Sequence, residues 1–246
     1  MTGRLADRVI LVTRAAEDAE PWIETIRSRG ARALSLPCIA TENFVDAGIR
    51  ATLVAGLETA SWIVFTSRRG VAATADLLED RMPAGVRIAV VGPSTAEEAE
   101  ARFGRTNFVS AGGTGRALAH ELAGLLALDA GAGPRCVLVA AADRGRRDLE
   151  EVLGPAGCEV LRVAVYRTVP APPRTPRVDL GALGVNTILL ASPSAVEGLL
   201  NQAEVPAEAT VISIGPSTTE AARASGLEVA GEAPRPDLEG LLEVIP

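Results

Sequence analysis

Short runs of consecutive apolar, largely β-branched residues recur along the chain, and they constrain its fold more than any other feature. The runs lie at residues 9–13, 33–36, 62–66, 87–91, 107–109, 136–140, 159–163, 187–191, 210–214 and 227–229. Apolar residues on consecutive positions indicate strands that are covered on both faces. Longer Ala-, Leu-, Glu- and Arg-rich segments predict helices at residues 18–29, 70–78, 95–102, 115–128, 146–153, 195–201 and 218–225. This alternation predicts an α/β fold with parallel sheets.

The chain also repeats itself. The segments Ile10-Leu-Val-Thr13, Trp62-Ile-Val-Phe-Thr-Ser67 and Gly92-Pro-Ser-Thr95 have counterparts in the other half of the chain. These counterparts are Val137-Leu-Val-Ala140, Thr187-Ile-Leu-Leu-Ala-Ser192 and Gly215-Pro-Ser-Thr218. Such repetition indicates an internal duplication of one α/β unit. Each copy has about five expected strands, which favours two small, doubly wound, flavodoxin-like sheets.

Composition narrows the function classes. The 246 residues suffice for one large domain or two small ones, and 48% of them are apolar. The net charge of -7 argues against general affinity for nucleic acid or an anionic membrane. All basic residues are Arg, so Schiff-base lysines and Walker-type phosphate sites are excluded. The single His120, expected on the surface of a helix, excludes His-rich metal sites and most serine or cysteine triads.

The three cysteines, Cys38, Cys136 and Cys158, are widely spaced in apolar surroundings. We expect reduced, buried thiols rather than a disulfide framework. The first residues lack the apolar segment of a signal peptide, and no run approaches the length of a membrane span. The sequence therefore predicts a cytoplasmic protein.

Two segments have the composition of linkers. Residues 128–134 are rich in Gly and Ala and separate the two sequence copies, so composition alone favours a domain boundary there. Residues 170–176 are rich in Pro and predict a stiff, extended connection. Periodicity does not choose between the two.

The paired Gly-Pro-Ser-Thr motifs are the sharpest functional signal. Each follows an apolar strand and opens a helix, so its Ser or Thr is expected to cap the helix while free N–H groups point outward. In a parallel sheet such turns lie at the carboxyl edge, where ligands bind. The motifs predict an anion site with ligands from Gly92, Ser94, Thr95, Gly215, Ser217 and Thr218, although ordinary capped turns would have the same sequence.

Other expected strand ends add hydroxyls and guanidinium groups, which bind carboxylates well. These candidate ligands are Thr13, Arg14, Thr66, Ser67, Arg68, Arg144, Arg146, Ser192 and Ser194. The segment Gly112-Gly-Thr-Gly-Arg116 could also hold an anion, but it lacks the spacing of a dinucleotide loop. Tyr166, the single Tyr, follows the run at residues 159–163 and is either a proton donor in a cleft or a packing residue.

Taken together and in this order, the Val-Thr-Arg, Phe-Thr-Ser, paired Gly-Pro-Ser-Thr, Val165-Tyr166 and Ala-Ser-Pro-Ser segments resemble the uroporphyrinogen-III synthase family. The resemblance extends from about Val9 to Leu242. Ala15 and the pair Arg68-Arg69 depart from the usual family pattern, which affects local loop shape.

The resemblance implies a cyclising hydro-lyase of haem biosynthesis. Such enzymes close hydroxymethylbilane, a linear tetrapyrrole with eight carboxylates, to uroporphyrinogen III, with inversion of the last ring and loss of water. It implies no cofactor and no metal, substrate binding between two domains largely through amides and hydroxyls, and Tyr166 as the catalytic residue.

The resemblance further implies discontinuous domains, in contrast to the compositional boundary. One domain would comprise residues 1–37 and 172–246, the other residues 41–166, with residues 37–41 and 166–173 as a two-stranded linker. We expect a monomer that binds no nucleic acid and no membrane. A non-catalytic tetrapyrrole or polyanion sensor, or another enzyme on the same fold, stays open as an alternative.

Overall fold

The computed structural model describes residues 5–128 and 135–246. Contacts between Cα atoms divide the chain into two compact units. Unit 1 comprises Met1–Ala40 and Thr168–Pro246, and unit 2 comprises Thr41–Arg167. The boundary that composition favours near residue 128 is wrong, because the elements on both sides of it belong to unit 2. Residues 129–134 of that segment lie outside the described residues.

Unit 1 has a five-stranded parallel sheet in the order β13-β12-β10-β1-β2. Its elements are β1 (Val9–Val12), α1 (Ala16–Ser28), β2 (Arg32–Ser35), β9 (Val178–Asp179), β10 (Thr187–Leu190), α7 (Pro193–Gln202), β11 (Ala203–Glu204), β12 (Thr210–Ser213), α8 (Pro216–Ala224), β13 (Val229–Glu232) and α9 (Leu238–Glu243). The short strands β9 and β11 pair separately.

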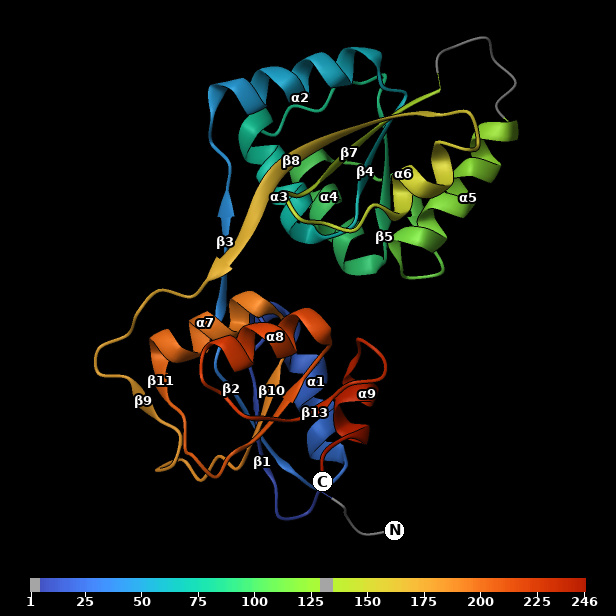
Figure 1. The fold of residues 1–246 in the computed structure, drawn as a ribbon. Coiled ribbons are helices and arrows are strands. Elements are labelled where there is room, and N and C mark those ends of the chain that lie inside the picture. The colour runs from blue at the N-terminus through green and yellow to red at the C-terminus, as the bar shows by residue number, and fades with distance from the viewer. Residues whose placement is uncertain (1–4, 129–134) are drawn as a thin grey trace. The chain divides into compact units, whose positions relative to one another are not determined.

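Unit 2 is built around a six-stranded sheet in the order β3-β8-β7-β4-β5-β6 (Figure 1). Its elements are β3 (Ile39–Asn43), α2 (Ala47–Thr59), β4 (Trp62–Phe65), α3 (Arg68–Leu78), β5 (Arg87–Val91), α4 (Pro93–Phe103), β6 (Phe108–Ser110), α5 (Gly115–Leu128), β7 (Cys136–Ala142), α6 (Asp148–Leu153) and β8 (Glu159–Pro170). The pairs β4–β5, β4–β7, β5–β6 and β7–β8 are parallel.

The apolar runs at the centre of each sheet form the buried strands β1, β4, β7 and β10, as their composition predicts, whereas the edge strands β2, β6 and β13 are partly exposed. Every residue of β4 is buried, and alternate side chains enter different clusters on the two faces of the sheet. Ile63 and Phe65 pack against α2, α3 and α4, whereas Trp62 and Val64 pack against α5 and α6. A strand covered on both faces has no room for polar residues, which explains why its sequence is continuously apolar.

Strand β8 is longer than the apolar run at residues 159–163 predicts. β8 continues to Pro170, so Tyr166 lies within a strand and not beyond its end. The Phe44 amide donates to the Val165 carbonyl at 2.9 Å, and the Ala171 amide donates to the Cys38 carbonyl at 2.9 Å. β8 therefore continues as a strand beyond its apolar run because its backbone pairs with β3.

Candidate functional site

The order in which the chain adds strands to the sheet of unit 2 reverses between β4 and β7. From β4 the chain proceeds to β5 and β6 on one side, and it then crosses to β7 and β8 on the other. Ligands in parallel α/β sheets bind at the carboxyl ends of the strands where the order reverses, because the helices there diverge. The corresponding point in unit 1 lies between β1 and β10.

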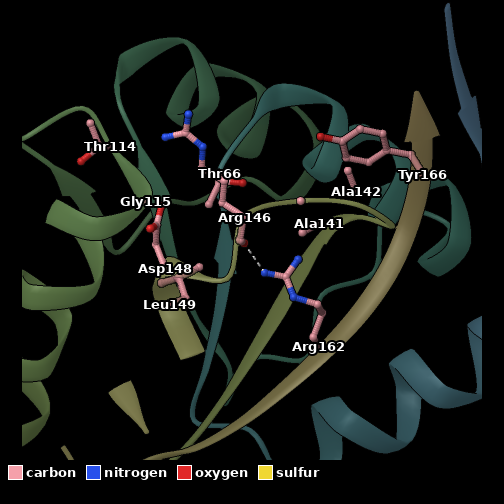
Figure 2. Close-up of a pocket in the computed structure, with 11 residues that line it drawn as sticks. Thr66, Thr114, Gly115, Ala141, Ala142, Arg146, Asp148, Leu149, Arg162 and Tyr166 are labelled. Atoms are coloured by element: carbon pink, nitrogen blue, oxygen red, sulfur yellow. Dashed lines mark hydrogen bonds between the residues drawn. The ribbon is translucent and has the colours of Figure 1, made fainter. Parts of the chain in front are cut away.

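A pocket of about 300 Å³ lies at the β4–β7 point, and all of its lining residues belong to unit 2 (Figure 2). The lining residues are Thr66, Thr114, Gly115, Ala141, Ala142, Gly145, Arg146, Asp148, Leu149, Arg162 and Tyr166. They lie at the end of β7 and in the loops after β4 and β7, just before or in the first turns of α5 and α6, or in β8. Loops held at the ends of rigid strands thus form the walls.

Tyr166 and Ser67 form the polar pair beside this pocket. The Tyr166 hydroxyl lies 3.0 Å from Ser67 Oγ, and either atom can be the donor. Ser67 also caps α3, since its Oγ accepts a hydrogen bond from the Gly70 amide at 3.2 Å. The Tyr166 side chain is only 6% exposed and packs in the core of unit 2. The pocket therefore has a phenol fixed in position by a helix cap.

Sequence reasoning missed Arg162 and Asp148 as lining residues of the pocket. Arg162 belongs to an apolar strand run, and a charged residue there was an available but unused signal. Asp148 begins α6 and pairs with Arg116, with Oδ1 3.3 Å from Arg116 Nη2. Thr114 and Gly115 belong to the Gly-rich segment 112–116, so part of that segment does lie at the site.

The structure brings Thr66, Arg146 and Tyr166 together in the pocket, with Ser67 adjacent. Arg68 and Arg144 lie nearby in the chain and are exposed. None of the other predicted ligands lines this pocket. Of the proposed site residues in unit 2, the structure therefore brings together those that follow β4 and β7 and Tyr166 within β8.

The Gly-Pro-Ser-Thr turns differ from the sequence prediction in their caps. Gly92 and Gly215 are the N-cap residues of α4 and α8, and no side chain caps either helix. Thr95 and Thr218 are only 3% and 1% exposed. The expected hydroxyl caps are wrong, because Pro at the first helical position moves Ser and Thr into the helix. Ser94 and Ser217 are the exposed hydroxyls of these turns.

In unit 1, Thr13 and Arg14 already have protein partners. The buried Thr13 Oγ1 donates to the Leu189 carbonyl at 2.7 Å, which ties the end of β1 to β10. Arg14 lies 3.7 Å from the Asp18 carboxylate and 4.5 Å from the centroid of the Trp22 ring. Ser192 caps α7 by accepting from the Ala195 amide at 3.2 Å, and Ser194 is half-buried in the first turn of that helix.

The cysteines are free and buried, as predicted. Burial raises the pKa of the Cys38 thiol to about 12 and also raises the pKa values of Cys136 and Cys158. These thiols are therefore poor nucleophiles at neutral pH. His120 is exposed, as expected. Within residues 5–128 and 135–246, no group of three or more His, Cys, Asp or Glu side chains is arranged to hold a metal ion.

The parallel strand order and the strand-end pocket define the class: an α/β protein with a pocket at the carboxyl edge of a sheet, the place where proteins of this class bind small molecules. A family model described as uroporphyrinogen-III synthase HemD matches residues 20–243. The chain therefore belongs to the uroporphyrinogen-III synthase family, as the sequence motifs indicate.

The chain is also similar to individual known proteins. The chain is 30% identical to "Uroporphyrinogen-III synthase, chloroplastic" of Oryza sativa subsp. japonica, over 96% of this chain and 79% of that protein. The solved uroporphyrinogen-III synthetase of Helicobacter pylori is 16% identical, with a TM-score of 0.55 and 96% of each chain covered. A mutant uroporphyrinogen III synthase from Thermus thermophilus is 19% identical, with a TM-score of 0.49 and the same coverage. The Helicobacter structure supports the fold.

Among the helices of the described residues, none combines the length and the apolarity that crossing a bilayer requires.

Proposed function

We propose that this chain cyclises hydroxymethylbilane to uroporphyrinogen III with loss of water and inversion of the last pyrrole ring. Its membership of the family supports the activity, and the match over residues 20–243 is the observation that carries it. The protein is thus a cyclising lyase of tetrapyrrole biosynthesis. This chemistry requires no cofactor, because the pyrrole nitrogen itself expels the terminal hydroxyl.

The harder task for the protein is to position the substrate. A flexible octaanion must fold so that the substituted carbon of the last ring attacks, and correct orientation of reacting groups can lower a barrier by roughly 7–11 kcal/mol. Protein groups at the strand ends would bind the carboxylates of the substrate and so hold it in this geometry. The exposed groups Arg68, Ser94, Arg144, Arg146 and Ser217 are the best candidates. The burial of Thr95 and Thr218 favours packing roles for them.

Tyr166 is proposed as the donor to the departing hydroxyl. Ser67 Oγ already accepts from the Gly70 amide, so its own proton is available for the Tyr166 oxygen at 3.0 Å. In that arrangement the phenol keeps its proton for the substrate. A hydrogen bond to the departing hydroxyl, rather than complete proton transfer, is the main contribution that we propose for this phenol.

The Tyr166→Phe variant tests this role. We expect a fold close to that of the wild type and a rate lower by ~10²–10³, the usual effect of losing one such donor. The product should still be the inverted isomer, because pyrrole-driven ionisation and substrate positioning survive. Thr52→Ala, which alters an exposed hydroxyl in α2, is the control. Wild-type turnover by Tyr166→Phe would leave Tyr166 as a packing residue.

The activity itself is tested by incubating the purified chain with enzymatically generated hydroxymethylbilane and separating the product isomers. The inverted isomer III is expected, whereas closure without inversion gives isomer I. Isomer I alone, together with measurable binding of the tetrapyrrole, would favour a non-catalytic sensor. Neither activity nor binding would favour an unrelated enzyme on this fold.

We also propose that the two units are duplicated, flavodoxin-like domains. Their strand orders support this: β7, β8, β4, β5 and β6 occupy the places that β1, β2, β10, β12 and β13 occupy in unit 1. The sequence repeats pair the same strands.

We further propose that the two domains move when substrate binds and that the active form is a cytoplasmic monomer. Identical small-angle scattering profiles with and without product would count against movement, and sedimentation analysis tests the monomer.

A further inference from the structure

An arginine–glutamate pair adjoins the pocket of unit 2, and its Arg162 is one of the lining residues. Arg162 Nε is 2.5 Å from Glu150 Oε1, and Arg162 Nη2 is 3.1 Å from Glu150 Oε2. Their side chains are only 14% and 20% exposed. Burial alone would raise the pKa of the Glu150 carboxyl, but hydrogen bonds from Arg162 and the backbone, with the positive charges of Arg162 and Arg147, lower it overall. Such two-point pairing fixes the plane of the guanidinium.

The same guanidinium holds the loop between β7 and α6. Arg162 Nη2 donates to the Arg146 carbonyl at 2.6 Å (Figure 2). The third nitrogen, Nη1, is buried and has no partner among the described residues. It lies under Gly145, where an added Cβ would approach it to 3.2 Å. The Asp143 amide donates to the Tyr166 carbonyl at 3.0 Å. The loop is therefore attached to β8 at two points, one of which is Tyr166.

This loop also carries a positive charge at the pocket. Within the part of the chain that the structure describes, the Arg146 guanidinium has no hydrogen-bond or ion-pair partner. The nearby carboxylates do have partners, because Asp148 and Glu151 pair with Arg116 and Glu150 pairs with Arg162. Arg146 is thus available to an anionic ligand, and the position of its backbone depends on Arg162.

We propose that Arg162, oriented by Glu150, is a positioning residue that places Arg146 to bind one carboxylate of the tetrapyrrole substrate. This inference rests on the proposed function. Burying a charged pair costs desolvation free energy, and removing one partner leaves an unpaired charge. In this place the pair has a structural effect, because it fixes the loop between β7 and α6 relative to Tyr166. A displaced loop would weaken substrate binding more than the chemical step.

Kinetics of Arg162→Lys and Glu150→Gln test the proposal. Lys keeps the charge but cannot bond Glu150 and the Arg146 carbonyl with one planar group. We expect KM for hydroxymethylbilane to rise about tenfold in both variants, the scale of one lost charge-assisted hydrogen bond, with kcat within about twofold of wild type. Arg50→Lys is the matched control, because Arg50 forms an exposed ion pair with Glu79 in the same unit.

A double-mutant cycle separates positioning from general structural damage. If Arg162 acts through Arg146, then Arg162→Lys should raise KM little further in an Arg146→Gln background. Additive effects on KM, or unchanged KM in both Arg162→Lys and Glu150→Gln, would overturn the inference. An inactive wild-type protein would instead refute the proposed function. Thermal unfolding of each variant confirms that the compared proteins are folded.

Discussion

Gly198 should be intolerant of even a single methyl group. This residue lies in the middle of α7, where an added Cβ would be 1.7 Å from the Cys38 carbonyl oxygen and 2.8 Å from the Ala171 nitrogen. Those two backbone groups are hydrogen-bonded to each other at 2.9 Å. Because neither is the flexible end of a side chain, the backbone itself would have to move or the hydrogen bond would have to open.

The expected cost follows from three contributions. Overpacking costs roughly 1–3 kcal/mol, and leaving a buried backbone pair unsatisfied costs a further ~1–3 kcal/mol. The better helix propensity of Ala stabilises the folded state by about 1 kcal/mol and offsets part of this loss. Gly198→Ala should therefore lower the free energy of unfolding by about 3 kcal/mol. At roughly 2–4 °C per kcal/mol, Tm should fall by about 6–12 °C.

Gly124→Ala is the matched control. Gly124 is an exposed residue in α5, and nothing lies within 4 Å of its added Cβ. The same substitution should there raise stability by about 0.5–1 kcal/mol. Calorimetric melting of both variants and the wild type gives the comparison. If Gly198→Ala melts at or above the wild-type temperature, the close approach of α7 to the Cys38–Ala171 pair is not as described.

Three further predictions concern single groups. Asp46 caps α2 through the amides of Gly48 and Ile49, so Asp46→Ala should cost about 1 kcal/mol in urea unfolding. The thiols of Cys38, Cys136 and Cys158 should react with Ellman's reagent only after denaturation, and rapid native labelling would contradict their burial. The pKa of the Glu150 carboxyl is lowered in the folded protein. The ionised carboxylate therefore stabilises the fold fully above the ordinary pKa of the carboxyl near 4.5, and this stabilisation is lost as the pH falls below that value. The stability difference between wild type and Glu150→Gln should therefore shrink as pH falls, and a constant difference would refute this.

Buried strands were predictable from sequence, and their exposed continuations were not. The run at residues 62–66 identifies β4 because both faces of that strand are covered. The apolar runs do not predict β3, since Thr41, Glu42 and Asn43 are polar residues at the edge of the sheet. Only the family resemblance implies a strand there, at residues 37–41. α2 was missed because it is weakly amphipathic, with few buried residues. Its start depends on Asp46, whose carboxylate accepts hydrogen bonds from the Gly48 and Ile49 amides.

In the candidate site, too, some residues can be recognised from the local sequence, whereas their contacts cannot. Its uniqueness in the sequence makes Tyr166 a candidate, but only the family resemblance implies a catalytic role for it. The hydroxyls at strand ends are candidates because of their position after apolar runs. The partner of Tyr166, Ser67, lies 99 residues away in sequence, and no local pattern pairs them. The role of Arg162 depends on a carboxylate from a neighbouring helix and a carbonyl from a loop. Such contacts arise from tertiary packing, which periodicity does not contain.

The division of the chain into units has a consequence for how the protein is made. Unit 2 is one continuous segment, whereas β1 of unit 1 pairs with β10, as in Ile10 with Thr187. A ribosome adding about 5–20 residues per second needs roughly 10–30 s to deliver that partner after β2 has emerged. During this interval the apolar segment Val9–Val12 has only β2 beside it. Unit 2 can therefore complete its sheet first, while β1 keeps one edge unpaired until β10 has been synthesised.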